Sequence, residues 1–212
     1  MASLKAAIIQ VTLFQQNCTL LWDEQIMKGV VIDPGGDVSK IVEAIEQVNL
    51  DVEKIVLTHG HIDHAGGALE LKEILKVKVE GPHRADEFLL SGIEAQAQEY
   101  GLSGVQNVSP DVWLTDNDTL SMAGTEFTIM HCPGHSPGSL VYYNAAAKFA
   151  IVGDVLFQGS VGRTDFPYGD TEALISSIEK HLLTLDDDVS FICGHGPGST
   201  IGQERRSNPF LR

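Results

Sequence analysis

The stretch VLTHGHIDHAGG, residues 56–67, constrains the fold of this chain more than any other segment. The apolar run at 54–58 predicts a buried strand, and an amphipathic helix is predicted at about 66–75. Between them stand His59, His61, Asp63 and His64. Alternate side chains of an extended segment point the same way, so His59 and His61 can reach one metal ion together. Asp63 and His64 then face a neighbouring ion, where the chain turns into the helix.

Three further ligand-type residues follow later apolar runs in the same way. His135 comes just after a predicted hairpin, Asp154 ends a predicted strand at 148–154, and His195 ends another at 189–195. The ends of strands can aim side chains into a common cleft. Five histidines and two aspartates are too many ligands for one tetrahedral ion, and they suit two ions that share a carboxylate. The remaining histidines are left out of the site: His83, His131 and His181.

The other apolar runs alternate between strands and helices. Further strands are predicted at 4–13, 18–22, 29–33, 77–81 and 138–144, with a hairpin at 118–132. Further helices are predicted at 39–48, 84–99, 170–185 and 200–205, and Asp37 is the expected N-cap of the first. Strands followed by a helix occur twice, with no linker or repeat across residues 1–212. We therefore expect a single α/β domain in which two β-sheets pack face to face, with helices on the outer faces.

Charge and cysteine content narrow the partners and the compartment. The formal net charge of −15 disfavours binding to nucleic acids, because phosphate backbones would be repelled. The three cysteines form no CxxC pair, which indicates reduced thiols and a cytoplasmic protein. They are interpreted as small buried residues, with a pocket-lining role open for Cys132 and Cys193. No signal peptide or membrane-spanning run is expected.

The segment THGHIDH resembles the signature of the metallo-β-lactamase fold, a four-layer αββα sandwich of two mixed sheets. The resemblance covers nearly the whole chain and implies that the ligands bind two divalent ions. Zinc is the expected metal, and iron and manganese are the alternatives. It assigns His59, His61 and His135 to the first ion, Asp63, His64 and His195 to the second, and Asp154 to the bridge between them. Asp33 falls where the family keeps a supporting carboxylate. The alternative for Asp33 is a simple turn former before Pro34.

Two such ions can hold a hydroxide between them at neutral pH, so that Asp63 and Asp154 would serve catalysis and no serine or cysteine nucleophile is required. Arg163, in a glycine-rich loop at 159–169, is expected to clamp a substrate carboxylate. This loop, with HCPGHSPGS, ICGHGPGST and ERRSNPFL, resembles the small bacterial branch of the type II glyoxalases. That resemblance implies hydrolysis of the glutathione thioester S-D-lactoylglutathione.

Two departures from the larger glyoxalases bear on the substrate. The chain is expected to lack their C-terminal helical domain, and Gly196 and Pro197 stand where they carry Glu-Tyr. The closest rival is a persulfide dioxygenase, because those enzymes share the fold and a stretch similar to GRTDF; they use a single iron, which His59, His135 and Asp154 could hold here. The same scaffold also suits a lactonase, a β-lactamase or a non-catalytic metal-binding protein, because fold alone does not fix function. The sequence leaves the physiological substrate and the oligomeric state open.

Overall fold

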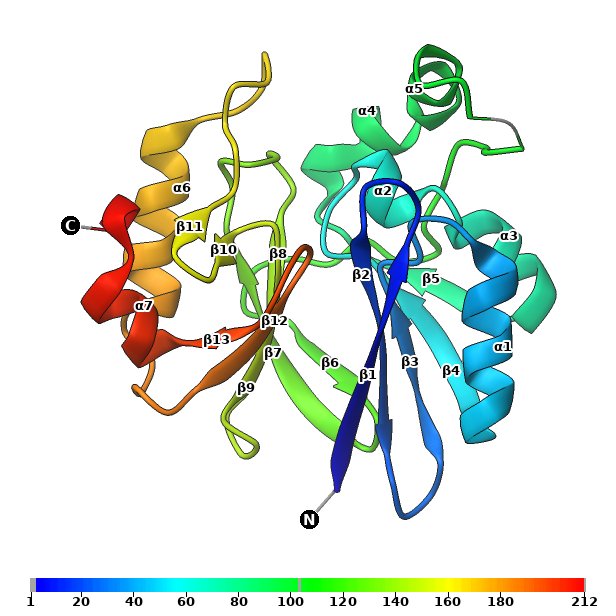
Figure 1. Cartoon of the computed structure of the whole chain (residues 1–212), viewed down its shortest axis with the longest axis horizontal. Coiled ribbons are helices and arrows are strands. Elements are labelled where there is room, and N and C mark those ends of the chain that lie inside the picture. The colour runs from blue at the N-terminus through cyan, green and yellow to red at the C-terminus, as the bar shows by residue number, and fades with distance from the viewer. Residues whose placement is uncertain (1–2, 103, 212) are drawn as a thin grey trace.

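Two β-sheets face each other in the computed structural model, which describes residues 3–102 and 104–211 (Figure 1). The first sheet has the order β1-β2-β3-β4-β5. Its strands are β1 (Leu4–Val11), β2 (Gln16–Asp23), β3 (Lys28–Ile32), β4 (Asp51–Val56) and β5 (Lys78–Glu80). The second sheet has the order β13-β12-β9-β8-β7-β6. Its strands are β6 (Thr119–Met122), β7 (Thr125–His131), β8 (Leu140–Asn144), β9 (Phe149–Gly153), β12 (Ser190–Cys193) and β13 (Ser199–Thr200).

Both sheets are mixed. Strands β3, β4 and β5 run parallel to one another, as do β9 and β12, whereas the other neighbouring pairs are antiparallel. A separate two-stranded hairpin joins β10 (Leu156–Phe157) and β11 (Ser160–Val161). The parallel strands end at the same edge of their sheet, and it is after β4, β9 and β12 that most of the predicted ligands follow in the chain.

Helices cover the outer faces of the two sheets (Figure 1). On the side of the first sheet lie α1 (Val38–Val48), α2 (Ile62–Ala65), α3 (Ala68–Leu75), the 3-10 turn Arg84–Asp86, α4 (Glu87–Leu90) and α5 (Ile93–Glu99). On the side of the second sheet lie α6 (Thr171–Ser177), continued by a π-helical turn at Ile178–Leu182, then α7 (Ile201–Ser207) and the 3-10 turn Pro209–Leu211.

Alternation along the strands explains the four layers. In β4, Ile55 packs toward the helices of the first sheet, whereas Val56 packs between the sheets. In β8, Val141 packs toward the helices of the second sheet, whereas Tyr142 packs between the sheets. Successive side chains of a strand point to opposite faces, so the part of a strand that is covered on both faces is apolar at successive positions. The Tyr142 hydroxyl donates to the carbonyl of Leu57 at 2.6 Å and so links the two sheets. The predicted αββα sandwich is confirmed.

Several local predictions differ from the structure. The helix expected at about 66–75 is α3, and a separate one-turn helix that was not predicted, α2, precedes it and includes Asp63 and His64. Asp37 lies at the N-cap of α1, but its side chain makes no capping bond. Asp37 is left-handed, with φ at 48°, and its Oδ2 accepts instead from the N–H of Thr12 at 2.8 Å. The helix expected at 84–99 is interrupted between α4 and α5.

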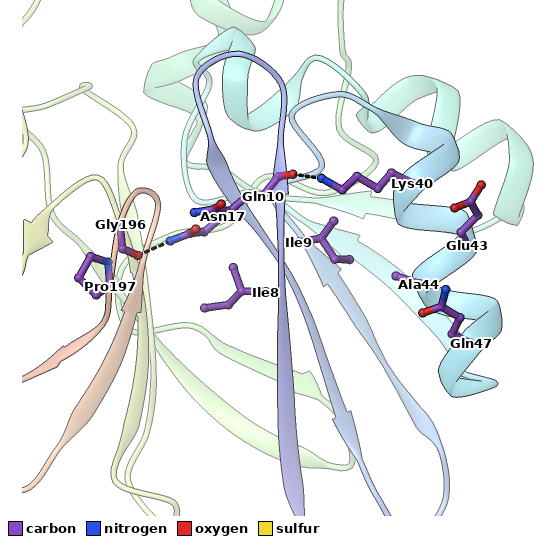
Figure 2. Close-up of a pocket in the computed structure, with 10 residues that line it drawn as sticks. All are labelled: Ile8, Ile9, Gln10, Asn17, Lys40, Glu43, Ala44, Gln47, Gly196 and Pro197. Atoms are coloured by element: carbon purple, nitrogen blue, oxygen red, sulfur yellow. Dashed lines mark hydrogen bonds between the residues drawn. The ribbon is translucent and has the colours of Figure 1, made fainter.

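The edge strand β1 borders a surface hollow of about 800 Å³ (Figure 2). On one side this hollow meets α1, and on the other it meets Gly196 and Pro197, which follow the ligand histidine after β12. The side-chain amide of Asn17 donates to the carbonyls of Gly196 at 2.8 Å and Cys193 at 3.0 Å. None of the predicted ligands lines this hollow, although Asn17 steadies the loop that carries His195. None of the helices in the described ranges has the length and apolar character needed to cross a bilayer.

Candidate metal centre

The structure brings all seven predicted ligands to one end of the two sheets. His59 and His61 follow β4, Asp63 and His64 lie in α2, and His135 follows β7, whereas Asp154 and His195 follow β9 and β12. Residues from both sheets therefore meet, although 74 positions separate His61 from His135 along the chain. The ring centroid of His59 lies 4.7 Å from that of His61, 4.0 Å from that of His64 and 5.0 Å from that of His135.

Three imidazole nitrogens form the first group. His61 Nδ1 lies 3.0 Å from His59 Nε2 and 3.0 Å from His135 Nε2. All three side chains are buried, and three ring nitrogens this close can bind one ion together. This is the trio that the family resemblance assigns to the first ion.

Asp63, His64 and His195 form the second group. Asp63 Oδ2 lies 3.2 Å from His195 Nε2 and 3.9 Å from His64 Nε2. Asp154 lies between the groups: its Oδ1 is 3.3 Å from His64 Nε2, and its Oδ2 is 3.5 Å from both His135 Nε2 and His195 Nε2. One carboxylate therefore reaches both groups, as a bridge between two ions requires.

Each of the five imidazoles is held from outside through its other ring nitrogen. The pairs are His59 Nδ1 with Thr58 Oγ1 at 3.0 Å, His61 Nε2 with the Tyr168 hydroxyl at 2.8 Å, His64 Nδ1 with Asp33 Oδ2 at 2.8 Å, His135 Nδ1 with the Arg163 carbonyl at 2.8 Å, and His195 Nδ1 with the Phe14 carbonyl at 3.2 Å. A carbonyl oxygen only accepts, so His135 and His195 carry their protons on Nδ1. Their Nε2 atoms, which face the cluster, are then free to bind metal.

Asp33 combines both roles considered from the sequence. It precedes Pro34 with φ at 52°, the left-handed conformation of a turn, and it is buried. Its Oδ1 accepts from the N–H of Thr58 at 2.7 Å, and its Oδ2 accepts from the Thr58 hydroxyl at 2.6 Å and faces His64. Asp33, His59 and His64 are also close enough to form a third potential ligand group. We assign Asp33 a supporting role instead, because Thr58 and His64 already occupy its oxygens.

Two buried atoms at the centre of the cluster have no hydrogen-bond partner among the described residues. They are His64 Nε2 and Asp154 Oδ1, which are 3.3 Å apart. A buried polar atom without a partner costs about 1–3 kcal/mol, so such atoms at a cluster of ligands indicate that something else binds them. The donor set of imidazoles and carboxylates suits zinc, iron or manganese. The residues present therefore fit divalent metal ions.

The electrostatics favour the ligand forms of most of these groups. Burial and the neighbouring histidines lower the pKa of His61 to about 3, and burial likewise lowers the pKa of His59, so both are neutral at pH 7. Burial alone would raise the pKa of Asp154, but His64 and the other histidines outweigh it and hold the pKa below its usual value. For His64, burial opposes the charge, whereas Asp154, Asp63 and Asp33 raise the pKa well above normal. A bound cation would replace that proton.

A cavity of about 410 Å³ opens onto the cluster, and Arg163 lines it as expected. The guanidinium is already engaged: its Nε and Nη2 donate to the two oxygens of Asp165, at 2.7 Å each. It also lies over the ring of Phe166, with Cζ 4.5 Å from the ring centroid. The pair is solvent-exposed, and exposed pairs contribute only ~0–1 kcal/mol, so a substrate carboxylate can compete for Arg163.

A family model described as the metallo-beta-lactamase superfamily matches residues 11–195. The chain belongs to this superfamily. A protein of Haemophilus influenzae called hydroxyacylglutathione hydrolase GloC is 47% identical over 205 residues, which cover 96% of each chain. A crystal structure of the BLEG-1 B3 metallo-beta-lactamase matches 98% of this chain and 99% of its own, with a TM-score of 0.89 and 33% identity. TTHA1623, crystallised in a di-iron-bound form, matches 97% of this chain and 100% of its own, with a TM-score of 0.86 and 35% identity. Superfamily membership and the histidine cluster support a metal-dependent hydrolase.

One buried group of this superfamily member, Asp86, was not predicted from the sequence. Its Oδ2 accepts from the N–H of Gly60 at 2.8 Å and the hydroxyl of Ser136 at 2.7 Å, and its Oδ1 accepts from the N–H of Gly138 at 2.5 Å. Gly60 lies between His59 and His61, and Ser136 follows His135, so one carboxylate joins both loops of the first group. A Cβ on Gly138 would lie 2.6 Å from Asp86 Cγ, so this close approach requires glycine.

The histidines that were left out of the predicted site also lie outside both ligand groups. His83 and His131 stack at 4.1 Å between ring centroids. His83 Nδ1 accepts from the N–H of Ala85, and His131 Nε2 bonds the carbonyl of Pro137 at 2.8 Å. The three cysteines are buried and free, and none of them lines the cavity over the cluster: Cys18, Cys132 and Cys193.

Proposed function

We propose that this protein is a thioester hydrolase that uses two divalent ions to hydrolyse S-D-lactoylglutathione. Zinc is the metal that we expect. The observation that carries the proposal is the pair of ligand groups joined by Asp154, which opens into a cavity with Arg163 at its rim. The 47% identity to a protein named hydroxyacylglutathione hydrolase supports the choice of substrate. The two groups of neighbouring ligand atoms support one ion at His59, His61 and His135 and another at Asp63, His64 and His195.

Divalent ions in this site would polarise the thioester carbonyl and lower the pKa of a water molecule from 15.7 to about 7. The chain itself has three tasks. It holds the ligand imidazoles in one orientation through their outer nitrogens, which removes the need for reorganisation during the reaction. It presents Asp63 at the cavity, where the carboxylate oxygen that does not bind the ion can accept the proton that the attacking water loses. It orients the substrate through Arg163.

The reaction consumes one water and needs no further reactant. The water oxygen bonds to the carbonyl carbon, the carbon–sulfur bond breaks, and the proton held on Asp63 passes to the thiolate of glutathione. D-Lactate and glutathione leave. Because glutathione carries carboxylates, its arm belongs on the side of the cavity where Arg163 stands.

Replacement of Asp154 by alanine tests the proposal. We expect Asp154→Ala to lower the metal content per chain and to reduce hydrolysis of S-D-lactoylglutathione to background, because the residue reaches both ligand groups. The matched control is Asp51→Ala, which removes an exposed carboxylate that pairs with Lys28 at 3.7 Å. Metal analysis and thiol release are the measurements. Full activity in Asp154→Ala would eliminate the bridging role, and inactivity of the metal-loaded wild type would eliminate the substrate.

A β-lactam hydrolase is the second candidate, favoured by the 33% identity and TM-score of 0.89 to BLEG-1. A panel of three substrates separates the candidates. A chromogenic β-lactam tests the second candidate, and oxygen uptake with glutathione persulfide tests a dioxygenase. Our proposal requires the thioester to have the highest kcat/KM of the three and requires no oxygen uptake.

A further inference from the structure

A second cavity, of about 380 Å³, adjoins the cavity over the metal cluster. The two share Phe14, Ile62 and Asp63 in their linings. The second is walled by the β1–β2 turn, the turn before α1, the start of α2, and Leu102 and Val105, which come after α5 in the chain. A molecule with its reacting carbonyl at the metal cluster can therefore extend into it.

The boundary between the two cavities is fixed to the metal site. Phe14 borders both, and its main-chain carbonyl accepts from His195 Nδ1–H at 3.2 Å. Its ring meets that of Tyr100 edge to face, with 5.7 Å between centroids. The turn is held from the other side by the bond from Thr12 N–H to Asp37 Oδ2. The second cavity is thus a defined neighbour of the cluster.

The lining favours an uncharged, apolar occupant. Apolar side chains come from Leu13, Ile62, Leu102 and Val105, and no lysine or arginine of the described residues lines this cavity. Its two aspartates, one of them Asp63, would repel an anion. Leu13 is 93% exposed at the tip of the turn, and an apolar chain lying beside it would remove part of that surface from water.

The two cavities differ in charge. Arg163 lines the cavity over the cluster but not its neighbour. One cavity therefore offers a cation for a carboxylate, whereas the other offers apolar surface. This difference suits the two chemically different ends of an acylated glutathione.

We propose that the second cavity is an acyl subsite that accepts aliphatic acyl chains longer than lactoyl, while the glutathione arm lies toward Arg163. The inference rests on the proposed thioesterase function. If the inference holds, the protein is an acyl-glutathione thioesterase whose kcat/KM rises with the length of the acyl chain. Each methylene transferred from water to an apolar subsite adds about three- to four-fold in binding.

The test is a series of straight-chain S-acylglutathiones from acetyl to octanoyl, assayed beside S-D-lactoylglutathione with metal-loaded protein. We expect kcat/KM of the wild type to rise by at least ten-fold from acetyl to hexanoyl. Val105→Trp places an indole in the cavity, and should lower the ratio of octanoyl to lactoyl kcat/KM at least ten-fold. Ile26→Trp, in the exposed turn between β2 and β3, is the control of equal bulk and should leave the wild-type ratio unchanged.

The outcomes separate the subsite from the function on which it rests. If the wild type hydrolyses lactoylglutathione but its kcat/KM stays flat or falls with chain length, the subsite is wrong and the thioesterase stands. The subsite is also wrong if Val105→Trp keeps the wild-type ratio of octanoyl to lactoyl kcat/KM. If the wild type hydrolyses no thioester in the series, the proposed function itself fails. The wild-type series decides the question even if Val105→Trp does not fold.

Discussion

The loops of the first ligand group depend on one carboxylate, so replacement of Asp86 should affect stability and metal affinity together. Asp86→Ala leaves two buried donors without an acceptor, the N–H groups of Gly60 and Gly138, whereas the Ser136 hydroxyl can donate to Ser139 Oγ at 2.7 Å. Each donor left without a partner costs about 1–3 kcal/mol, so the free energy of unfolding should fall by about 2 kcal/mol or more. Asp86→Asn keeps one side-chain oxygen that can accept hydrogen bonds. If that oxygen takes the place of Oδ2, only Gly138 loses its acceptor, and the loss is about 1–3 kcal/mol.

The assays are urea unfolding of the metal-free protein and chelator competition for the first ion. Because Asp86 acts through the loops of His59, His61 and His135, we expect the affinity for that ion to fall about ten-fold in Asp86→Asn. Asp111→Asn is the matched control, since this exposed carboxylate accepts from Val79 N–H at 2.8 Å and pairs with Lys72 away from the ligands. Wild-type unfolding and wild-type metal affinity in both Asp86 variants would refute the reasoning.

Three further outcomes are expected. Arg163→Ala should raise KM for lactoylglutathione more than it lowers kcat, and Asp165→Ala, which frees the guanidinium, should lower KM; unchanged kinetics in both variants would remove Arg163 from the site. The ion at Asp63, His64 and His195 should leave first under increasing chelator, because the His195 side chain is 30% exposed whereas His59 is fully buried; measured metal loss in a single step would contradict this. The cysteine thiols should resist a thiol reagent at pH 8 in the native protein and all react in denaturant. Burial raises the pKa of Cys132 to about 12 and of Cys193 to about 11, so the reactive thiolate is scarce at pH 8, and fast native labelling would refute this.

The ligand cluster could be predicted because its signal is local. Each ligand follows an apolar run, and a strand end followed by a polar ligand can be recognised within about seven residues of sequence. The αββα layering could be predicted because the end of β4 and most of β8 are apolar at successive positions, which requires cover on both sides. Burial, alternation and strand ends are properties of short segments, and the sequence displays them directly.

Asp33 was expected to support a ligand only through the family resemblance, and the other distant groups that hold the ligands could not be predicted, because their contacts join positions far apart in the chain. Tyr168 reaches His61 across 107 positions, and Asp86 reaches Gly138 across 52. Before such contacts are known, Tyr168 is one more aromatic residue in a glycine-rich loop, and Asp86 is an acidic residue at a helix start. The pairing of Arg163 with Asp165 is different, since two positions separate them. A neighbouring carboxylate was the local signal for this pair, whereas the expected partner of Arg163 was a substrate.

The β1–β2 turn connects the metal site to the substrate. The carbonyl of Phe14 fixes His195, the most exposed of the five imidazoles, and its ring borders both cavities. Any substrate that moves this turn therefore also changes the orientation of His195 and, through it, the second ligand group. The first group is held differently: buried Thr58 bonds His59, whereas Tyr168 and the carbonyl of Arg163, both in the loop at 159–169, bond His61 and His135. Of these two segments, only the β1–β2 turn lines the second cavity, so the chain length of the acyl group and the occupancy of the second ion should be linked.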